Sequence, residues 1–369
     1  MMKKISFSKP LINKKDSLSL IKKVINSNFP NEGKFTNRFE KIAKKILKSK
    51  YAVATTSGTA AIYLALKALD VKPGDEVVIP NITFQATANA VKMTGATVKL
   101  VDIDPHTLLI DLFKLKKVIT NKTKVVIPVH ISGRGQNINE LVKFCKKNKI
   151  EVIEDSAEAF GSKYKNKSLG SFGRCGCFSF APNKIITTGQ GGLIITNEIN
   201  IYKKLLALKN QGRIGESTGG QDDFICEGTN LRFTNLQAAI GISQLKTFEK
   251  RKKKLISIYK FYKKNINENH EFKIFSFDKG EIPLWTDAYC AKRDKLIKFL
   301  KNNGIQCRPY WFTINSTKPY KSASKNLLVS QKIQKKLLWL PSSLSITKTQ
   351  QKKVCNMINF FFKINLNDK

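Results

Sequence analysis

Apolar and polar residues follow two different periods along the first two thirds of the chain. Short runs rich in β-branched residues predict strands at residues 51–55, 76–79, 97–102, 124–129, 151–155, 176–180 and 192–196. In the intervening segments apolar residues recur every three or four positions, which predicts helices at residues 39–47, 57–69, 83–93 and 139–148. Strands that alternate with helices form a largely parallel sheet covered by helices on both faces. We therefore predict an α/β fold.

The pattern changes after Thr234. Leu236 begins an apolar helical pattern, which predicts one long helix that becomes rich in Lys after Lys250. Beyond it we predict a strand near 283–290, a helix at 293–302, a strand near 305–311 and a last helix from residue 347. This order is typical of a smaller α+β unit. We therefore divide the chain into a large α/β domain at residues 14–245 and a small C-terminal α+β domain at residues 246–369.

The composition is that of a globular protein of about two domains. Of 369 residues, 41% are hydrophobic and 25% are charged, which excludes a disordered chain and a small disulfide scaffold. No run approaches the roughly 20 apolar residues that cross a bilayer, and the N-terminus lacks the apolar core of a signal peptide. The seven cysteines form no Cys-x-x-Cys pair. We expect reduced thiols, a cytoplasmic location, no membrane contact and no metal site.

The net charge is unusually high. The chain has 66 Lys and Arg residues against 27 Asp and Glu residues, a formal charge of +39. Such an excess can indicate a nucleic-acid partner. However, only eight of the basic residues are Arg, the usual reader of bases and phosphates, and the 58 Lys residues are scattered. We favour a Lys-rich coding bias over a specific nucleic-acid function.

Two residues, one at the end of a predicted strand and one between two strands, are candidates for a catalytic or ligand-binding role. Asp155 ends the strand at 151–155, at the edge of a parallel sheet where ligands bind, although an Asp there can equally cap a turn. Lys184 lies between two strands in an uncharged segment that precedes a glycine-rich turn. A lysine in such surroundings loses its proton more easily and becomes a nucleophilic amine. The alternative is one more surface lysine.

Two further features precede helices. The segment Thr55-Thr-Ser57-Gly58-Thr59 has the strand, small-residue loop and helix start that seat a phosphate on backbone N–H groups, or alternatively an ordinary helix cap. Phe84 follows the next strand and alone would be interpreted as a core residue. Together the four features supply a phosphate seat, an aromatic face, a carboxylate and a reactive amine. This is the set of groups that pyridoxal 5'-phosphate requires.

The order and spacing of these features resemble the DegT/DnrJ/EryC1/StrS family of sugar aminotransferases, which are fold-type I pyridoxal-phosphate enzymes. The resemblance runs from about Phe35 to the C-terminal helix. It rests on Phe39-Glu, Ser57-Gly-Thr-Ala-Ala, Pro73-Gly-Asp-Glu-Val, Thr83-Phe-Gln-Ala-Thr-Ala-Asn-Ala, Val101-Asp-Ile-Asp, Ile127-Pro-Val-His, Ile153-Glu-Asp-Ser-Ala-Glu, Cys177-Phe-Ser-Phe, Thr187-Thr-Gly-Gln-Gly-Gly, Gly228-Thr-Asn-Leu-Arg, Leu236-Gln-Ala-Ala, Arg308-Pro and Leu340-Pro-Ser-Ser.

The resemblance implies a transaminase and assigns its cofactor site. Lys184 is implied to bond covalently to the cofactor, Asp155 to pair with the ring nitrogen, and Phe84 to stack on the ring. Glu158 is implied to lie near the ring hydroxyl, where many relatives have Gln. The phosphate is implied to be held by Gly58, Thr59, Ser179 and, from the neighbouring subunit of a homodimer, Asn230.

The polar segment around Asn230 has two interpretations. By resemblance, the run from Gly228 to Arg232 closes the cofactor pocket of the neighbouring subunit, and Arg232 lines the same shared wall. The alternative is a plain N-terminal cap for the helix that follows, with Thr234 and Asn235 as the capping candidates.

Within the family, the runs Glu154-Asp-Ser-Ala-Glu-Ala-Phe-Gly and Asn183-Lys-Ile-Ile-Thr-Thr-Gly are most similar to GDP-perosamine synthases. This similarity implies transfer of an amino group from L-glutamate to a 4-keto-6-deoxy sugar linked to GDP, a step of polysaccharide biosynthesis. The chain has Ile314-Asn315 where relatives usually carry a His that shapes the sugar site. A UDP- or dTDP-linked keto sugar, aminated at C3 or C4, is therefore the alternative substrate.

Three other classes of protein are less favoured. A dinucleotide-dependent oxidoreductase would need a third glycine after Gly133-Arg-Gly135, but Ile138 stands there. Sugar dehydratases of the same fold replace the cofactor lysine by His, so Lys184 favours transfer. A non-catalytic or nucleic-acid-binding basic protein agrees with the fold and charge alone, but not with the presence of all four cofactor features.

Overall fold

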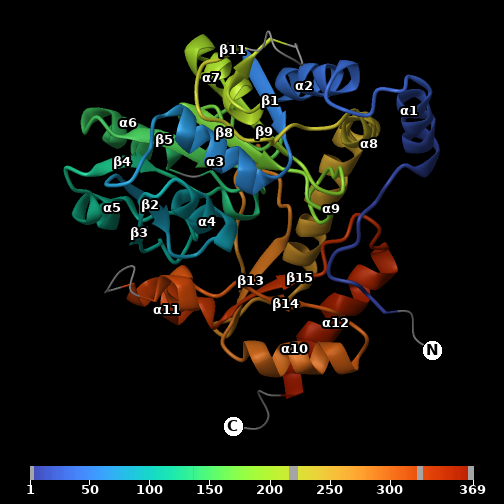
Figure 1. The fold of residues 1–369 in the computed structure, drawn as a ribbon. Coiled ribbons are helices and arrows are strands. Elements are labelled where there is room, and N and C mark those ends of the chain that lie inside the picture. Colours follow the sequence, from blue (N-terminus) through green and yellow to red (C-terminus); the bar gives the residue numbers. More distant parts are fainter. Residues whose placement is uncertain (1–3, 136, 216–222, 322–326, 365–369) are drawn as a thin grey trace.

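The structure, a computed structural model, describes residues 4–135, 137–215, 223–321 and 327–364. Its centre is a seven-stranded sheet (Figure 1), whose strand order is β1 (Tyr51–Thr55), β9 (Gly192–Thr196), β8 (Cys175–Ser179), β5 (Glu151–Asp155), β4 (Thr123–Val126), β2 (Glu76–Pro80) and β3 (Thr97–Val101). Neighbouring strands run parallel except at β9, which pairs antiparallel with β1 and β8. The predicted α/β fold with a mostly parallel sheet is confirmed.

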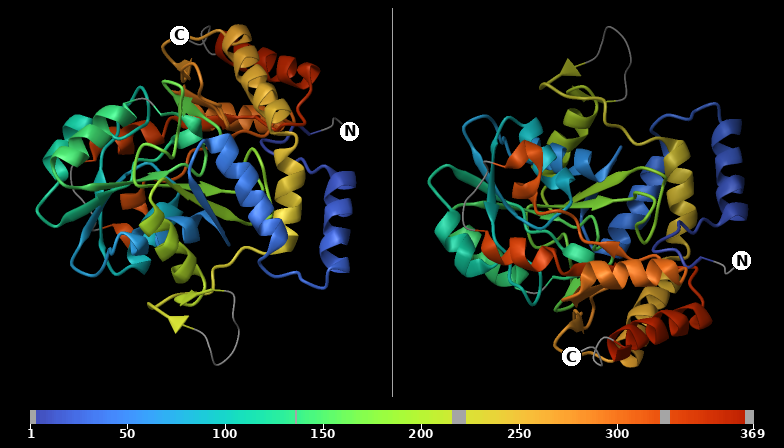
Figure 2. Two further views of the ribbon diagram at one scale, coloured as in Figure 1. Left: turned by 90° about the horizontal axis from the view of Figure 1, so that it is seen from above. Right: turned by 90° about the horizontal axis from the view of Figure 1, so that it is seen from below.

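Helices cover both faces of this sheet (Figure 2), because successive strand residues point to opposite faces. Val77 and Ile79 share a hydrophobic cluster with α3 (Gly58–Ala68), α4 (Gln85–Met93) and α7 (Ile199–Lys209). Val78 lies between them in sequence and packs instead with α5 (Leu112–Val118) and α6 (Ile138–Lys147). At the β1 end, this second face is covered by α2 (Lys34–Leu47) and α8 (Asn235–Leu245), and α1 (Lys14–Asn26) packs against α8.

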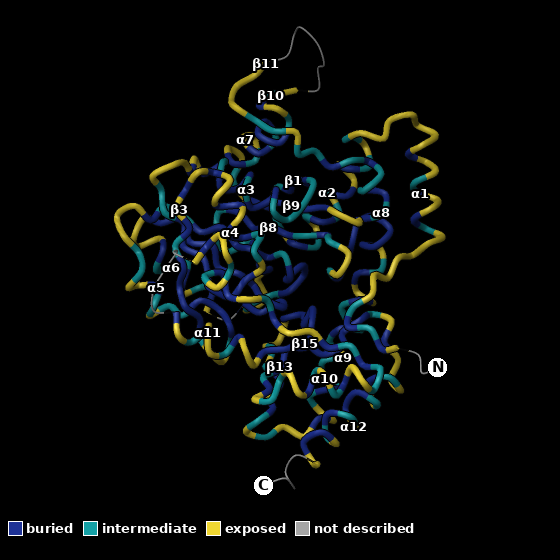
Figure 3. Tube along the Cα trace, turned by 60° about the horizontal axis from the view of Figure 1, so that its bottom comes forward, coloured by how far each residue is buried: buried dark blue, intermediate teal, exposed yellow. Residues whose placement is uncertain are grey.

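The buried interior continues from the large sheet into a smaller antiparallel sheet (Figure 3). The order of its strands is β12 (Phe272–Ile274), β13 (Thr286–Cys290), β15 (Leu337–Leu340) and β14 (Arg308–Pro309). The helices of this region are α9 (Phe248–Asn265), α10 (Arg293–Asn302) and α12 (Lys348–Ile364). Phe178 of the large sheet and Leu338 of the small one belong to the same hydrophobic cluster, so the two sheets pack against a common core.

Several short elements complete the described chain. They are the hairpin of β6 (Lys163–Tyr164) and β7 (Lys167–Ser168), the pair β10 (Arg213–Ile214) and β11 (Asp223–Phe224), α11 (Leu328–Gln334), and the 3-10 helices η1 (Ile131–Gly133), η2 (Ile314–Ser316) and η3 (Lys318–Tyr320). The β10–β11 pair projects from the body of the molecule (Figure 1). Within the described ranges, no helix is both long and apolar enough to span a membrane.

Two predicted elements differ from the structure. The single long helix expected after Thr234 is two helices, α8 and α9, which are separated at Lys246 and Thr247. The Thr247 hydroxyl donates to the Gln244 carbonyl at 3.0 Å, a local bond that competes with continuation of the helix. The strand expected near 305–311 is only the two residues of β14. We keep the domain division at residues 245 and 246 as a proposal, which the break between α8 and α9 supports.

Candidate active site

Lys184 lies in a tight loop between β8 and β9, at the edge of the large sheet where β5 and β8 end. The loop is closed by backbone hydrogen bonds: Phe180 N donates to Gly191 O at 2.9 Å, and Thr188 N donates to Phe180 O at 3.1 Å. Gly189 has a φ of 82°, a left-handed conformation that favours glycine. The glycine-rich sequence after Lys184 is therefore explained by the turn.

The amine of Lys184 faces a carboxylate and an aromatic ring. Its side chain is 12% exposed, and Nζ lies 3.4 Å from Oε1 of Glu158. Nζ also lies 5.2 Å from the centre of the Trp285 ring. Lys184 is therefore a partly buried amine with specific neighbours.

Asp155 is the last residue of β5 and is buried. Its Oδ2 accepts a hydrogen bond from the Thr87 hydroxyl at 2.7 Å, and its Oδ1 accepts from the Ala157 N–H at 3.1 Å. Burial raises the pKa of Asp155, while these hydrogen bonds and the charge of Lys184 oppose the increase. A cation bound against this carboxyl would favour its ionised form.

Glu158 is the carboxylate closest to the amine. Its Oε2 accepts a hydrogen bond from the backbone N–H of Ser132 at 2.7 Å, while its Oε1 faces Lys184. Burial raises the pKa of Glu158, and the charge of Lys184 and the Ser132 N–H lower it. The structure therefore brings the predicted residues Lys184, Asp155 and Glu158 into one electrostatic cluster.

The start of α3 has the geometry of an anion site. Ser57 caps the helix by accepting a hydrogen bond from Ala60 N at 3.1 Å. The N–H groups of Gly58 and Thr59 belong to the first helical turn, where the helix provides no acceptor and the helix dipole favours negative charge. A Cβ on Gly58 would lie 2.9 Å from the Cβ of Ser179, so glycine permits this close approach. The three predicted phosphate residues of one subunit are thus adjacent.

Phe84 is not a core residue. It precedes α4 and is 57% exposed, with its ring centre 5.6 Å from that of Trp311. Trp311 in turn lies 6.1 Å from Trp285, the neighbour of Lys184. An exposed aromatic face is therefore connected to the amine by two further aromatic rings.

A small cavity opens beside Lys184. It lies between the loop of Lys184, the N-terminal segment and the small sheet, and its polar lining includes Ser8, Lys9, Asn183 and Ser342. Two amines, those of Lys9 and Lys184, border the same cavity and give it a positive character.

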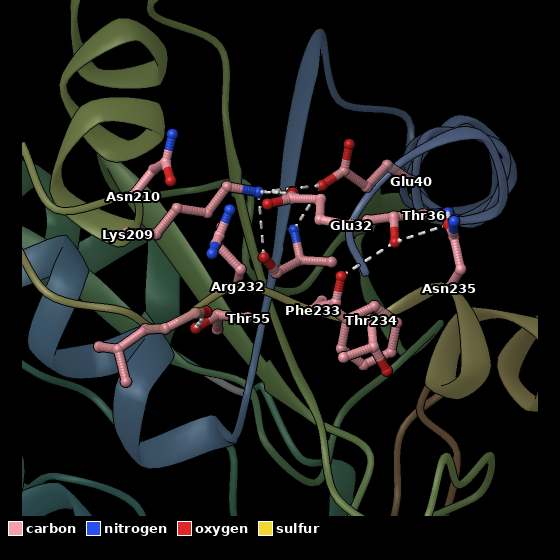
Figure 4. A network of polar contacts seen from close by, with 12 residues as sticks. Glu32, Thr36, Glu40, Thr55, Lys209, Asn210, Arg232, Phe233, Thr234 and Asn235 are labelled. Atoms are coloured by element: carbon pink, nitrogen blue, oxygen red, sulfur yellow. Dashed lines mark hydrogen bonds and ion pairs between the residues drawn. The ribbon is translucent and has the colours of Figure 1, made fainter. Parts of the chain in front are cut away.

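Arg232 lies in an extended segment beside the end of α7 (Figure 4), and Asn230, two residues earlier, pairs with Asn210 in an isolated antiparallel β-bridge. Leu231 N donates to Lys209 O at 3.0 Å, and the Thr55 hydroxyl donates to Leu231 O at 2.8 Å. Arg232 Nε donates to Asn230 Oδ1 at 3.2 Å. Within the described ranges, Asn230 forms no side-chain hydrogen bond to the start of α3 in its own chain.

The helix cap predicted near this segment is present. Thr234 and Gln237 form a reciprocal capping box at the start of α8. Asn235 is the first helical residue and has another role, because its Oδ1 accepts the N–H groups of Phe35 and Thr36 at 3.0 and 3.1 Å at the start of α2. The cap begins two residues after Arg232, so it does not account for Asn230.

A buried ion cluster anchors the same segment. Lys209 is 3% exposed, and its Nζ pairs with Glu32 and lies 3.8 Å from Glu40 Oε1 and 3.4 Å from Ala54 O (Figure 4). Since the Lys209 carbonyl binds Leu231, the cluster connects α2 and β1 to the segment that carries Asn230.

Replacement of Glu40 by Gln is expected to reduce the pH dependence of stability. Burial raises the pKa of Glu40 from 4.5 to about 7. Protonated Glu40 therefore contributes to the stability of the folded state. This contribution is complete below pH 4.5 and is lost as the pH rises through about 7. A shift of this size corresponds to at most about 3 kcal/mol. Gln has no charge and keeps the oxygen that accepts the Ala54 N–H. The free energy of unfolding in urea should therefore fall less in Glu40→Gln than in wild type across this pH range, whereas equal falls would contradict the account.

Four residues of the site were not singled out from the sequence. Thr87 contacts Asp155, and Trp285 contacts Lys184. The Ser132 N–H donates to Glu158, and Asp287 accepts from the Ser132 hydroxyl. Thr87 lies within the run that begins at Thr83, but this run gave no role to its hydroxyl. The others had no local signal, because they approach the site only through folding.

Ile314 and Asn315 are fixed to the end of β2. Ile314 is buried, and its N–H donates to Asn81 O at 2.9 Å. The side chains of Asn81 and Asn315 are hydrogen-bonded at 3.1 Å, and Asn315 N donates to Asn81 Oδ1 at 3.1 Å. This pair holds η2 in place.

Comparison with known proteins agrees with this geometry. The model of the DegT/DnrJ/EryC1/StrS aminotransferase family matches residues 12–359. A GDP-perosamine synthase of Escherichia coli O157:H7 is 35% identical over 338 residues, 90% of this chain and 91% of that protein. A GDP-4-keto-6-deoxy-D-mannose 3-dehydratase of Yersinia pseudotuberculosis is 31% identical over 340 residues, 84% of this chain and 86% of that protein. An aminotransferase structure from Psychrobacter cryohalolentis has a TM-score of 0.90 at 26% identity, covering 97% of this chain and 99% of that chain.

The resemblance identified from the sequence motifs is therefore confirmed, together with the prediction of a transaminase that uses pyridoxal 5'-phosphate. The match includes the large sheet, the loop of Lys184 and most of the small sheet and its helices. The chain belongs to the DegT/DnrJ/EryC1/StrS aminotransferase family.

Proposed function

We propose that this protein transfers an amino group from L-glutamate to a 4-keto-6-deoxy sugar linked to GDP. The observation that carries the proposal is the partly buried amine of Lys184, which lies 3.4 Å from Glu158 Oε1 at the edge where β5 and β8 end. The GDP-linked substrate is supported by the similarity to a GDP-perosamine synthase over most of both chains.

The residues of the site fit pyridoxal 5'-phosphate. Gly58 permits the close approach of Ser179 to the start of α3, where N–H groups without helical acceptors favour an anion. Asp155 is a buried carboxyl that a ring cation would ionise, and Phe84 offers an exposed aromatic face. When bound, the cofactor supplies an electron sink that lets an amino group leave one carbon and join another.

Lys184 has two roles in this proposal. Its amine would hold the cofactor covalently, and its free Nζ would accept and return a proton as a general base and acid. Glu158 faces the same nitrogen and stabilises a proton there when it is ionised. Trp285 lies over the amine and limits the access of water on that side.

The reacting parts of both substrates are proposed to bind next to Lys184, beside which the small cavity opens. Lys9 borders it and provides a positive charge for an acidic group of the donor or of the nucleotide. A panel of GDP-, UDP- and dTDP-linked 3-keto and 4-keto sugars, each incubated with glutamate and the holoenzyme, tests the substrate. We expect amination of the GDP-linked 4-keto sugar, whereas preference for another nucleotide or carbon would replace this substrate and leave the enzyme class unchanged.

Dehydration of the same sugar is the second candidate, because a GDP-4-keto-6-deoxy-D-mannose 3-dehydratase is also similar to this chain. By resemblance, those relatives have His at the position of the cofactor lysine. The presence of Lys184 favours amino transfer, and product mass distinguishes the two reactions.

We also propose a homodimer with shared active sites. The β10–β11 pair projects from the body and exposes apolar side chains of Ile214 and Phe224, which suits burial against a second copy. The exposed Asn230 and its neighbour Arg232 would then reach the cofactor phosphate of the partner. A cytoplasmic location is supported by the seven free cysteines, six of which are buried.

Mixing two inactive variants is expected to restore activity if Asn230 acts across the dimer. Equal amounts of Lys184→Ala and Asn230→Ala subunits give mixed dimers in which one of the two sites has both native residues, so roughly a quarter of wild-type activity should return after subunit exchange. Lys184→Ala mixed with Asp155→Asn is the control, because both residues belong to one chain's site and no recovery is expected. Absence of recovery in the first mixture would place Asn230 outside the partner's site.

A further inference from the structure

Ser132 has an unusual backbone conformation beside the proposed catalytic amine. It is buried in η1 with a φ of 54°, in the left-handed region that is unfavourable for most residues other than Gly, Asn and Asp. Gly133 follows with a φ of 102°, and a Cβ there would lie 2.1 Å from Ile282 O. Such a conformation persists only where the surroundings hold it, and it is common at functional sites.

The surroundings hold all three polar groups of Ser132. Its N–H donates to Glu158 Oε2 at 2.7 Å, and its carbonyl accepts from Leu284 N at 3.0 Å. Its hydroxyl donates to Asp287 Oδ1 at 2.8 Å, a contact between residues 155 positions apart. Two of the three partners thus come from the small sheet and the segment that leads into it.

Asp287 is itself held without exposure to solvent. It lies in β13 and pairs with Arg134, whose guanidinium lies 4.0 Å from the centre of the Phe277 ring. Trp285 precedes Asp287 by two residues and contacts the amine of Lys184. The beginning of the β13 region therefore reaches Lys184 in two ways, directly through Trp285 and indirectly through Asp287, Ser132 and Glu158.

We propose that Asp287 and Ser132 are positioning residues. The bond between Asp287 and the Ser132 hydroxyl keeps the Ser132 N–H directed at Glu158, and this N–H keeps the negative charge of Glu158 next to the nitrogen of Lys184. The inference rests on the proposed role of Lys184 as the cofactor lysine. It assigns a function to the Gly133-Arg-Gly135 run, because Arg134 neutralises Asp287 and Gly133 permits the close approach of Ile282.

The charges around Glu158 set the direction of the effect. The positive charge of Lys184 favours ionised Glu158, whereas the negative charges of Asp155 and Asp287 disfavour it. Arg134 and Tyr310 are charged or titratable neighbours of Asp287. Loss of the Ser132 N–H would make Glu158 easier to protonate. A proton on the nitrogen of Lys184 would then lose its nearest negative partner and would dissociate at lower pH.

The test is a pH titration of the visible absorbance of the holoenzyme, which reports the proton on the nitrogen that joins Lys184 to the cofactor. Ser132→Ala removes only the hydroxyl and leaves the Arg134–Asp287 pair intact. We expect its midpoint to move about 0.5–1 pH unit lower, the equivalent of one hydrogen bond. Asp287→Asn leaves Arg134 without its partner and should move the midpoint in the same direction. The double variant should shift less than the sum of the two single variants, because both act through one contact.

Asp102→Asn is the matched control. Asp102 is equally buried and binds Lys114 and the N–H groups of Val329 and Ser330, but it does not contact Glu158 or Lys184. It should lower thermal stability and leave the midpoint unchanged. If Asp287→Asn fails to fold, Ser132→Ala decides the question. A Ser132→Ala midpoint within about 0.2 pH unit of wild type would overturn the inference. Attachment of the cofactor to another lysine, mapped after borohydride reduction, would instead overturn the role of Lys184 on which it rests.

Discussion

Replacement of Lys184 by alanine is expected to reduce amino transfer to below about one thousandth of the wild-type rate while leaving the fold intact. Alanine can neither bond to the cofactor nor carry a proton. The side chain is partly buried, and its amine makes one long polar contact, 3.4 Å to Glu158, and lies 5.2 Å from the Trp285 ring centre, so its loss should cost little stability. Product formation, thermal unfolding and intact mass after borohydride reduction are the measurements. The cofactor should still bind, but borohydride should no longer fix it to the protein.

Lys203→Ala is the control for this experiment. Lys203 is an exposed lysine of α7, outside the site, and its replacement should leave both activity and covalent attachment as in wild type. Covalent cofactor in the reduced Lys184→Ala protein would show that another lysine is the anchor, and the assignment of this loop would then be wrong.

Replacement of Asp155 by Asn is expected to lower kcat by about 100-fold or more without destabilising the apoprotein. Burial raises the pKa of Asp155, so a neutral amide removes a charge whose burial is unfavourable. Asn keeps an oxygen that can accept the Thr87 hydroxyl. It cannot, however, supply the negative charge that stabilises a protonated ring nitrogen. Activity should therefore fall while the apoprotein unfolds at the same or a higher temperature, as expected where function opposes stability.

The measurement for Asp155→Asn combines steady-state kinetics with thermal unfolding of the apoprotein and holoenzyme. Asp102→Asn again provides a buried carboxylate outside the site. The control should lose stability and retain kcat. A variant at position 155 with wild-type kcat would remove Asp155 from the cofactor site.

Local patterns predicted the elements that have regular burial. Most residues of Glu151–Asp155 and of Gly58–Ala68 are buried, and these segments form the predicted strand and helix. The proximity of the candidate residues at their ends could be predicted as well, because a parallel sheet collects the ends of its strands at one edge.

The contacts that the small sheet makes with the site could not be predicted from local sequence patterns. Asp287 meets Ser132 across 155 positions, and nothing near Ser132 indicates that its backbone is left-handed. Trp285 and Asp287 were included in an expected strand, where residues two apart point to the same face. The acidic residue therefore breaks the alternation, but the pattern does not show what it binds. Their role depends on how the small sheet packs against the large one.

The break between α8 and α9 illustrates the same limit at the level of secondary structure. Apolar residues continue at helical spacing through Leu245 and resume at Phe248, so periodicity favours one helix. The Thr247 hydroxyl donates to Gln244 O at the junction between the two helices. The polar residues between the apolar runs could have indicated the interruption, although they are also common on the surface of a continuous helix.

Transfer of labelled nitrogen tests the central claim most directly. The holoenzyme is incubated with L-glutamate that carries isotopically labelled nitrogen and with a GDP-linked 4-keto-6-deoxy sugar, and the nucleotide sugar is analysed by mass spectrometry. The account predicts that the carbonyl oxygen of the sugar is replaced by one labelled amino group, and that Lys184→Ala forms no such product. A sugar that loses its 3-hydroxyl without gaining labelled nitrogen, or labelled product formed equally by Lys184→Ala, would contradict the account.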